Sequence, residues 1–112
     1  MQKVIEVDGK PVAFKATAST ARRYRQQFNR DLLIDIQTLS ESAGKGETLS
    51  ASALEMFEDI AYTMAKQADD TVPSTADEWL DGFDMFSIYE ILPEIIELWG
   101  INTQTLEPSK KK

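Results

Sequence analysis

The chain has 112 residues and a formal net charge of −7, and it contains neither cysteine nor histidine. A chain of this length can form one domain whose core needs no metal or disulfide. The lack of both residue types excludes the usual zinc sites and removes the common general base near neutral pH, so we expect no enzyme, no metal and no cofactor. The absence of cysteine is also compatible with a reducing cytoplasm.

The acidic side chains are concentrated in the second half of the chain. Residues 1–66 hold nine acidic and nine basic side chains, residues 67–109 hold ten acidic and no basic ones, and three lysines end the sequence. Nucleic-acid binding requires a basic surface for the phosphates. This distribution therefore argues against nucleic acid as a direct ligand.

A β-hairpin is predicted within residues 1–16. Two β-type runs, Val4–Val7 and Val12–Lys15, flank Asp8 and Gly9, a common signal for a tight hairpin turn. Two strands alone are marginally stable in water, so one face of the hairpin must lie against helices. The apolar side chains available for that face are Val4, Ile5, Val7, Val12 and Phe14.

Two helices are expected next. The first runs from Ser19 or Thr20 to about Asn29, a residue that tolerates the left-handed conformation at a helix C-terminus. The second is capped by Asp31, fades at residues 40–42 and is followed by a flexible loop at 43–47. The side chains expected to point inward are Ala21, Tyr24, Phe28, Leu32, Leu33, Ile36 and Leu39.

All four arginines lie within nine residues, on the first helix and at its C-terminal flank. Two interpretations stay open for the helix face that carries Arg22 and Arg25. The face is either a solvated surface that pairs with the acidic half of the chain, or a contact for an acidic partner.

The third helix is the clearest amphipathic segment of the chain. Either Ser50 or Ser52 begins it, and Ser52 with Glu55 matches a capping box. The outer face of this helix is expected to include Asp59. Its core face is formed by apolar residues at intervals of three and four, namely Leu54, Phe57, Ile60, Ala61, Met64, Ala65 and Ala68.

Residues 79–101 are the most apolar segment, because fourteen of these twenty-three side chains are Trp, Leu, Phe, Met, Ile or Tyr. A short helix that begins at Thr75 and ends near Gly82 leads into it. Asp84 is expected to cap a long helix with a kink near residues 89–90, because Pro93 removes one backbone hydrogen bond. The apolar stripe of this helix consists of Met85, Ile88, Tyr89, Leu92, Ile95, Ile96 and Trp99.

Carboxylates limit what this apolar segment can do. They argue against a membrane span, and no spacing among them matches a calcium loop, so they are expected to be solvated. The stripe is wider than one core face needs, and part of it is therefore expected to bind a partner. The carboxylates are Asp81, Asp84, Glu90, Glu94 and Glu97, with Asp77 just before the segment.

Together these elements predict a mainly α (α+β) fold. A small hairpin at residues 1–16 packs on a bundle of about four to five helices, in a single domain that covers residues 1–101. Helical periodicity is lost after Gly100, so residues 102–112 are expected to form a flexible C-terminal tail.

Three sequence blocks carry a family resemblance: RRYRQQFNRDLL from Arg22, IAYTMAKQAD from Ile60 and EWLDGFDMFSIYEILPEIIELWG from Glu78. They resemble the tail assembly chaperones of long-tailed phages and prophages of Gram-positive bacteria, over nearly the whole chain. The resemblance implies a non-enzymatic protein of the host bacterial cytoplasm that is absent from the mature virion. Its implied partners are the tape-measure protein, the tail-tube protein and further copies of itself, with no membrane and no nucleic acid.

The resemblance also implies where partners bind. The apolar segment would form the main surface and the arginine helix a second contact. The implied partner-binding residues are Trp79, Phe83, Phe86, Tyr89, Leu92, Ile96, Trp99, Arg22 and Arg25. Many such chaperones are also made as a longer product by ribosomal slippage near the end of the gene. Lys110–Lys112 of this sequence would mark such a site, although an ordinary basic tail has the same sequence.

A second class of function is an acidic inhibitor that mimics nucleic acid. The arginine-free segment from Gln67 to Pro108 supports it. Its carboxylates, however, alternate with bulky apolar residues instead of forming one continuous charged stripe. The chaperone therefore remains the leading hypothesis, and competition with DNA for a nuclease or repressor would distinguish the two.

Overall fold

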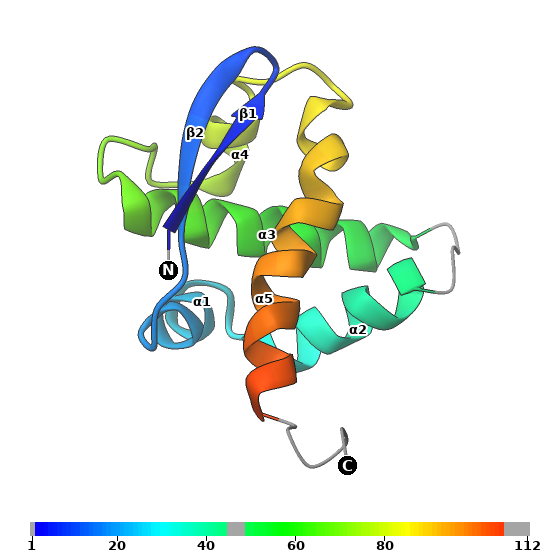
Figure 1. Ribbon diagram of the computed structural model, residues 1–112. Helices are drawn as coiled ribbons and strands as arrows, with labels where there is room; N and C mark the ends of the chain where they lie inside the picture. Colours follow the sequence, from blue (N-terminus) through cyan, green and yellow to red (C-terminus); the bar gives the residue numbers. More distant parts are fainter. Residues whose placement is uncertain (1, 45–48, 107–112) are drawn as a thin grey trace.

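The fold combines an N-terminal hairpin with a set of helices (Figure 1). The computed structural model describes residues 2–44 and 49–106. Within these residues, a two-stranded antiparallel sheet is followed by five α-helices and one short 3-10 helix. The predicted mainly α (α+β) fold with a hairpin packed on helices is therefore confirmed.

The hairpin consists of β1 (Gln2–Val7) and β2 (Lys10–Lys15), which pair antiparallel. Asp8 and Gly9 form the two-residue turn between them. Both have positive φ, 55° and 76°, as the type I′ turn favoured in hairpins requires. The predicted turn signal is thus confirmed.

One face of the hairpin is buried and the other is open. Side chains alternate along a strand, so Ile5 and Val7 of β1 and Phe14 of β2 share the buried face. Val4 lies on the opposite face and is exposed. Its predicted place among the inward side chains is wrong, because a strand cannot direct both Val4 and Ile5 to the same side.

Helices α1 (Thr20–Phe28) and α2 (Leu32–Gly44) follow the hairpin. Asn29 ends α1 with a left-handed φ of 58°, and the Asp31 side chain accepts hydrogen bonds from two backbone N–H groups in the first turn of α2. Both predicted end signals are confirmed. Leu33 is exposed, however, so its predicted inward orientation is wrong. The core face of α2 is formed by Leu32, Ile36 and Leu39.

Helix α3 (Ala51–Ala68) lies in the middle of the molecule, and β2, α1, α2 and α4 all pack on it (Figure 1). Its N-cap is Ser50, whose Oγ accepts a hydrogen bond from the backbone N–H of Ala53, so the capping box at Ser52 is not used. Because neighbours cover α3 on several sides, Asp59 is buried. The predicted position of Asp59 on an outer face is wrong.

The apolar second half contains α4 (Ala76–Leu80), the 3-10 helix η1 (Ser87–Ile91) and α5 (Leu92–Leu106). The predicted long helix from Asp84 with a kink is wrong: the chain forms η1 first and begins α5 afterwards. Pro93 then lies in the first turn of α5, where a backbone N–H has no helical partner to lose.

Two segments predicted to be irregular extend beyond the described residues. α2 continues to Gly44, into the predicted loop at 43–47, of which residues 45–47 lie outside the described part. α5 passes the predicted end at Gly100 and is helical to Leu106. The remainder of the predicted flexible tail, residues 107–112, lies outside the described part.

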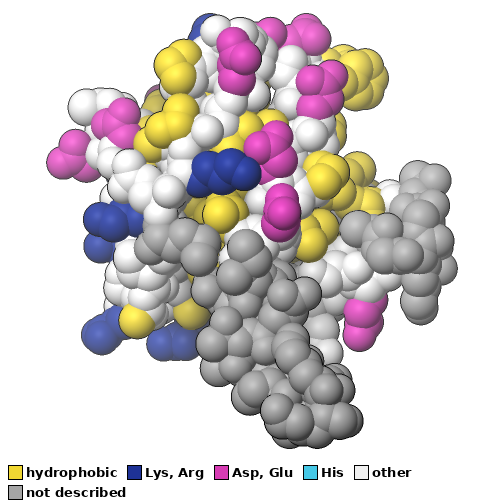
Figure 2. Space-filling model, viewed as in Figure 1, with side chains coloured by type: hydrophobic (Ala, Val, Ile, Leu, Met, Phe, Trp, Pro, Cys, Tyr) yellow, Lys and Arg dark blue, Asp and Glu magenta, His cyan; other side chains and the backbone are white. Residues whose placement is uncertain are grey.

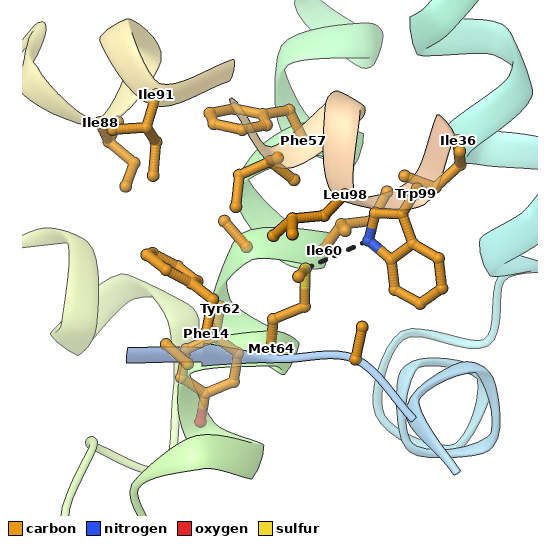
Figure 3. Close-up of a cluster of buried hydrophobic side chains, with 14 of the residues drawn as sticks. Phe14, Ile36, Phe57, Ile60, Tyr62, Met64, Ile88, Ile91, Leu98 and Trp99 are labelled. Atoms are coloured by element: carbon orange, nitrogen blue, oxygen red, sulfur yellow. Dashed lines mark hydrogen bonds between the residues drawn. The ribbon is translucent and has the colours of Figure 1, made fainter. Parts of the chain in front are cut away.

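The core lies where α3 meets the hairpin and α5. Both tryptophans belong to it, and the indole N–H of Trp99 donates a hydrogen bond to Sδ of Met64, with 3.2 Å between the two atoms (Figure 3). Trp79 packs against the rings of Phe14 and Phe83, with centroid distances of 6.4 and 5.1 Å. Much of the apolar second half is therefore buried by the chain itself.

Candidate partner-binding surface

Four large apolar side chains are exposed, and they occur as two pairs of sequence neighbours. Met85 and Phe86 are 73% and 66% exposed, in the segment between α4 and η1, and we call them the exposed pair. Leu33 and Ile34 are 57% and 60% exposed on α2, and we call them the α2 pair. Contiguous exposed apolar surface is a feature of interaction sites, so both pairs are candidates for one.

The hairpin turn holds the exposed pair in place. The ammonium group of Lys10 donates a hydrogen bond to the carbonyl oxygen of Gly82 at 3.0 Å, and the backbone N–H of Asp84 donates one to Oδ2 of Asp8 at 3.2 Å. On the other side, the backbone N–H of Tyr89 donates to the carbonyl oxygen of Phe86 at 3.2 Å, which begins η1. The pair is therefore presented by a segment that is fixed at both ends.

Acidic residues flank the exposed pair along the chain. Asp81, Asp84 and Glu90 are exposed and lie within five residues of it along the chain, and the hairpin turn adds Asp8. Lys10 is the basic group that the contacts above place beside this segment. Figure 2 shows hydrophobic side chains next to acidic ones at the upper right, over the segment between α4 and α5.

The predicted apolar binding residues differ in accessibility. Trp79 and Trp99 are buried in the core, so they offer a partner little surface in this conformation. Phe86 is exposed. The remaining four are half-buried and lie next to the core: Phe83, Tyr89, Leu92 and Ile96.

The half-buried Tyr89 is oriented by a hydrogen bond. Its hydroxyl donates to the Glu58 carboxylate on α3, and this bond, followed by burial, raises the pKa of Tyr89 to about 12. The ring of Tyr89 also packs near that of Phe57, with centroids 6.2 Å apart. This contact couples η1 to the buried face of α3 and helps to keep Tyr89 half-buried.

The predicted basic binding residues Arg22 and Arg25 are exposed on α1. Neither forms an ion pair within residues 2–44 and 49–106. Several basic side chains gather at the lower left of Figure 2, where α1 lies, away from the segment between α4 and η1 at the upper right. The structure thus separates the two predicted contacts, and Arg22 and Arg25 do not pair with the acidic half within the described residues.

Arg30, the fourth arginine, forms an ion pair within the fold. Its Nε donates a hydrogen bond to Oδ2 of Asp35 at 2.9 Å, and the Tyr24 hydroxyl donates to the same oxygen at 2.6 Å. Burial and then this bond to Asp35 raise the pKa of Tyr24. The network links α1 to α2. No sequence motif predicts it, because the three residues meet only after both helices have packed.

Asp59 lies close to this network. Burial, and then the charge of Glu55, raise the pKa of Asp59 to about 6, and the positive charge of Arg30 acts in the opposite direction. The arrangement places a carboxylate with a raised pKa inside the helical core, so protonation of Asp59 couples the stability of the fold to pH.

The described residues contain no group of three or more acidic side chains placed to hold a metal ion. None of the helices in those residues has the length and apolar character needed to cross a membrane. Comparisons with protein-family models, curated proteins and solved structures find no match to this chain. Any functional assignment must therefore depend on the sequence blocks and on the surfaces described above.

Proposed function

We propose that this chain is a non-enzymatic tail assembly chaperone of a long-tailed phage or prophage. In this proposal it binds and solubilises the tape-measure protein in the host bacterial cytoplasm, helps to recruit tail-tube subunits, self-associates, and is absent from the mature virion. The resemblance of the three sequence blocks motivates the assignment.

The exposed pair is the observation that carries the proposal. Met85 and Phe86 belong to the longest of the three blocks, and they remain 73% and 66% exposed although both tryptophans of that block are buried. Covering a large apolar side chain completely is favourable by roughly 1.5 to 3 kcal/mol. A protein that keeps two such side chains exposed on an anchored segment is suited to binding an apolar client.

The nucleic-acid mimic is less well supported. Such a mimic needs a continuous run of exposed carboxylates, whereas the exposed pair interrupts the acidic surface between Asp84 and Glu90. If the purified protein displaced DNA from a nuclease or repressor at low salt, this alternative would be favoured over the chaperone.

Co-expression tests the proposal. The tape-measure protein of the same phage or prophage would be produced alone, with the wild-type chain, and with the double variant Met85→Ser and Phe86→Ser. We expect the wild-type chain to move the tape-measure protein into the soluble fraction and to co-purify with it, and the double variant to lose most of both effects. No effect of the wild-type chain on solubility would reject the proposal.

The α2 pair supplies the matched control. The double variant Leu33→Ser and Ile34→Ser removes a similar amount of exposed apolar surface from α2. It should still solubilise the tape-measure protein if the exposed pair is the binding surface. Circular dichroism of all three proteins would verify that each is folded.

A further inference from the structure

Carboxylates outnumber basic groups near the exposed pair. Asp81 and Asp84 lie on the pair's own segment, Glu90 lies on η1, and Asp8 and Lys10 lie at the end of the hairpin that is bonded to this segment. The local balance is four negative charges against one positive, or −3. A partner that covers the pair must approach these charges closely, where opposite charges attract and like charges repel.

Lys10 is already engaged. It donates a hydrogen bond to the carbonyl oxygen of Gly82, and its ammonium group lies 5.9 Å from the ring centroid of Phe83. The side chains of Asp81, Asp84 and Glu90 have no ion pair within residues 2–44 and 49–106. Their charges are therefore available to an incoming partner.

We infer that the segment bound at the exposed pair is a cationic amphipathic helix. Its apolar face covers Met85 and Phe86, and lysines or arginines beside that face meet Asp81, Asp84 and Glu90. This inference rests on the proposed function, because it specifies the chemistry of the client segment. It also explains why residues 67–106 of the chain carry no basic side chain: a lysine there would repel such a client.

Two designed peptides test the inference without the natural client. One is a helical peptide with leucines on one face and lysines on the other, and the second has glutamate in place of every lysine. Fluorescence anisotropy would measure the binding of each labelled peptide to the full chain at low and at high salt. We expect the lysine peptide to bind about tenfold or more tightly than the glutamate peptide, and its binding to weaken as salt rises.

Variants of the chain separate this site from general attraction to an acidic protein. Met85→Ser with Phe86→Ser, and separately Asp84→Asn with Glu90→Gln, should each weaken the lysine peptide about tenfold. The matched control, Glu41→Gln with Asp70→Asn, removes two exposed carboxylates elsewhere and should change binding less than about twofold. Equal weakening by both charge variants, or equal binding of both peptides, would overturn the inference.

Two further measurements distinguish a failure of this inference from a failure of the proposed function. If wild-type protein solubilises the tape-measure protein and the Asp84→Asn, Glu90→Gln variant does so equally well, the inference fails while the proposed function stands. If the lysine peptide binds as expected but the tape-measure protein stays insoluble, the proposed function fails instead. Equilibrium sedimentation would detect a second copy at the site: a mass above 12.6 kDa that returns to 12.6 kDa in the Met85→Ser, Phe86→Ser variant would overturn the inference.

Discussion

The buried carboxylate of Asp59 makes the free energy of unfolding depend on pH. Its pKa rises from 3.8 to about 6, mainly through burial, so the folded protein retains a proton that the unfolded chain releases. The unfolded state therefore binds fewer protons between these two values, and this group lowers the free energy of unfolding as pH rises through the window. Above about pH 6 the destabilisation from Asp59 is complete.

Asp59→Asn should therefore stabilise the protein at neutral pH. We expect a gain of about 1 to 3 kcal/mol at pH 7 that shrinks towards zero near pH 4, because asparagine carries no charge that burial can penalise. Urea unfolding at several pH values would measure it. The exposed Asp70→Asn serves as a control, and a gain for Asp59→Asn that did not depend on pH would contradict this explanation.

Two tyrosines donate to carboxylates in different environments. Tyr24→Phe removes a buried hydrogen bond to Asp35 and should lower the free energy of unfolding by about 1.5 to 3 kcal/mol. Tyr89→Phe removes a bond to Glu58 at a half-buried position, where water can replace the donor, and should lower it by less than about 1 kcal/mol. Chemical denaturation of both variants would show whether burial sets the order; a larger loss for Tyr89→Phe would show that it does not.

At the scale of secondary structure, the start of α3 allows a direct comparison of two serines. Ser50→Ala should destabilise the protein by about 1 kcal/mol, since the Ser50 hydroxyl accepts a hydrogen bond from the Ala53 backbone N–H at 3.2 Å. Ser52→Ala should change stability by only a few tenths of a kcal/mol, roughly, because Ser52 is exposed and does not cap the helix. Thermal unfolding would distinguish them, and the reverse order would place the cap at Ser52.

The sequence predicts turns and helix ends well where a few neighbouring residues determine the local backbone conformation. Asp8 and Gly9 define the hairpin turn, Asn29 ends α1 and Asp31 caps α2. The long helix from Asp84 was not predictable in the same way. Its apolar spacing fits a helix, but the chain departs from helical geometry at 81–86, where the hairpin turn binds Gly82 and Asp84.

The candidate surface was only partly predictable from the sequence. The apolar excess of residues 79–101 predicts a binding site in this segment, and of the apolar residues predicted for it Phe86 is exposed. Apolar spacing places Met85 in the same stripe as Trp99, and it does not indicate that Met85 is exposed while both tryptophans are buried. Which apolar residue stays exposed depends on how η1 and α5 pack on α3 and the hairpin, and one-dimensional spacing does not contain that information.

For the molecule as a whole, basic and acidic surfaces are separated. The exposed arginines of α1 and the acidic environment of the exposed pair lie on different parts of the surface (Figure 2). Such an arrangement favours oriented association with a charged partner and makes its rate sensitive to salt.

Oxidation of methionine tests the central claim, that the exposed pair is the surface that a client covers. In the free protein, mild peroxide should oxidise the exposed Met85 rapidly and leave the fully buried Met64 unreacted. Mass spectrometry would then compare these rates in the complex with the tape-measure protein. We predict that Met85 oxidation slows about tenfold or more on binding, as expected when a client excludes solvent from an interface core; an unchanged rate in a stable complex would contradict the claim.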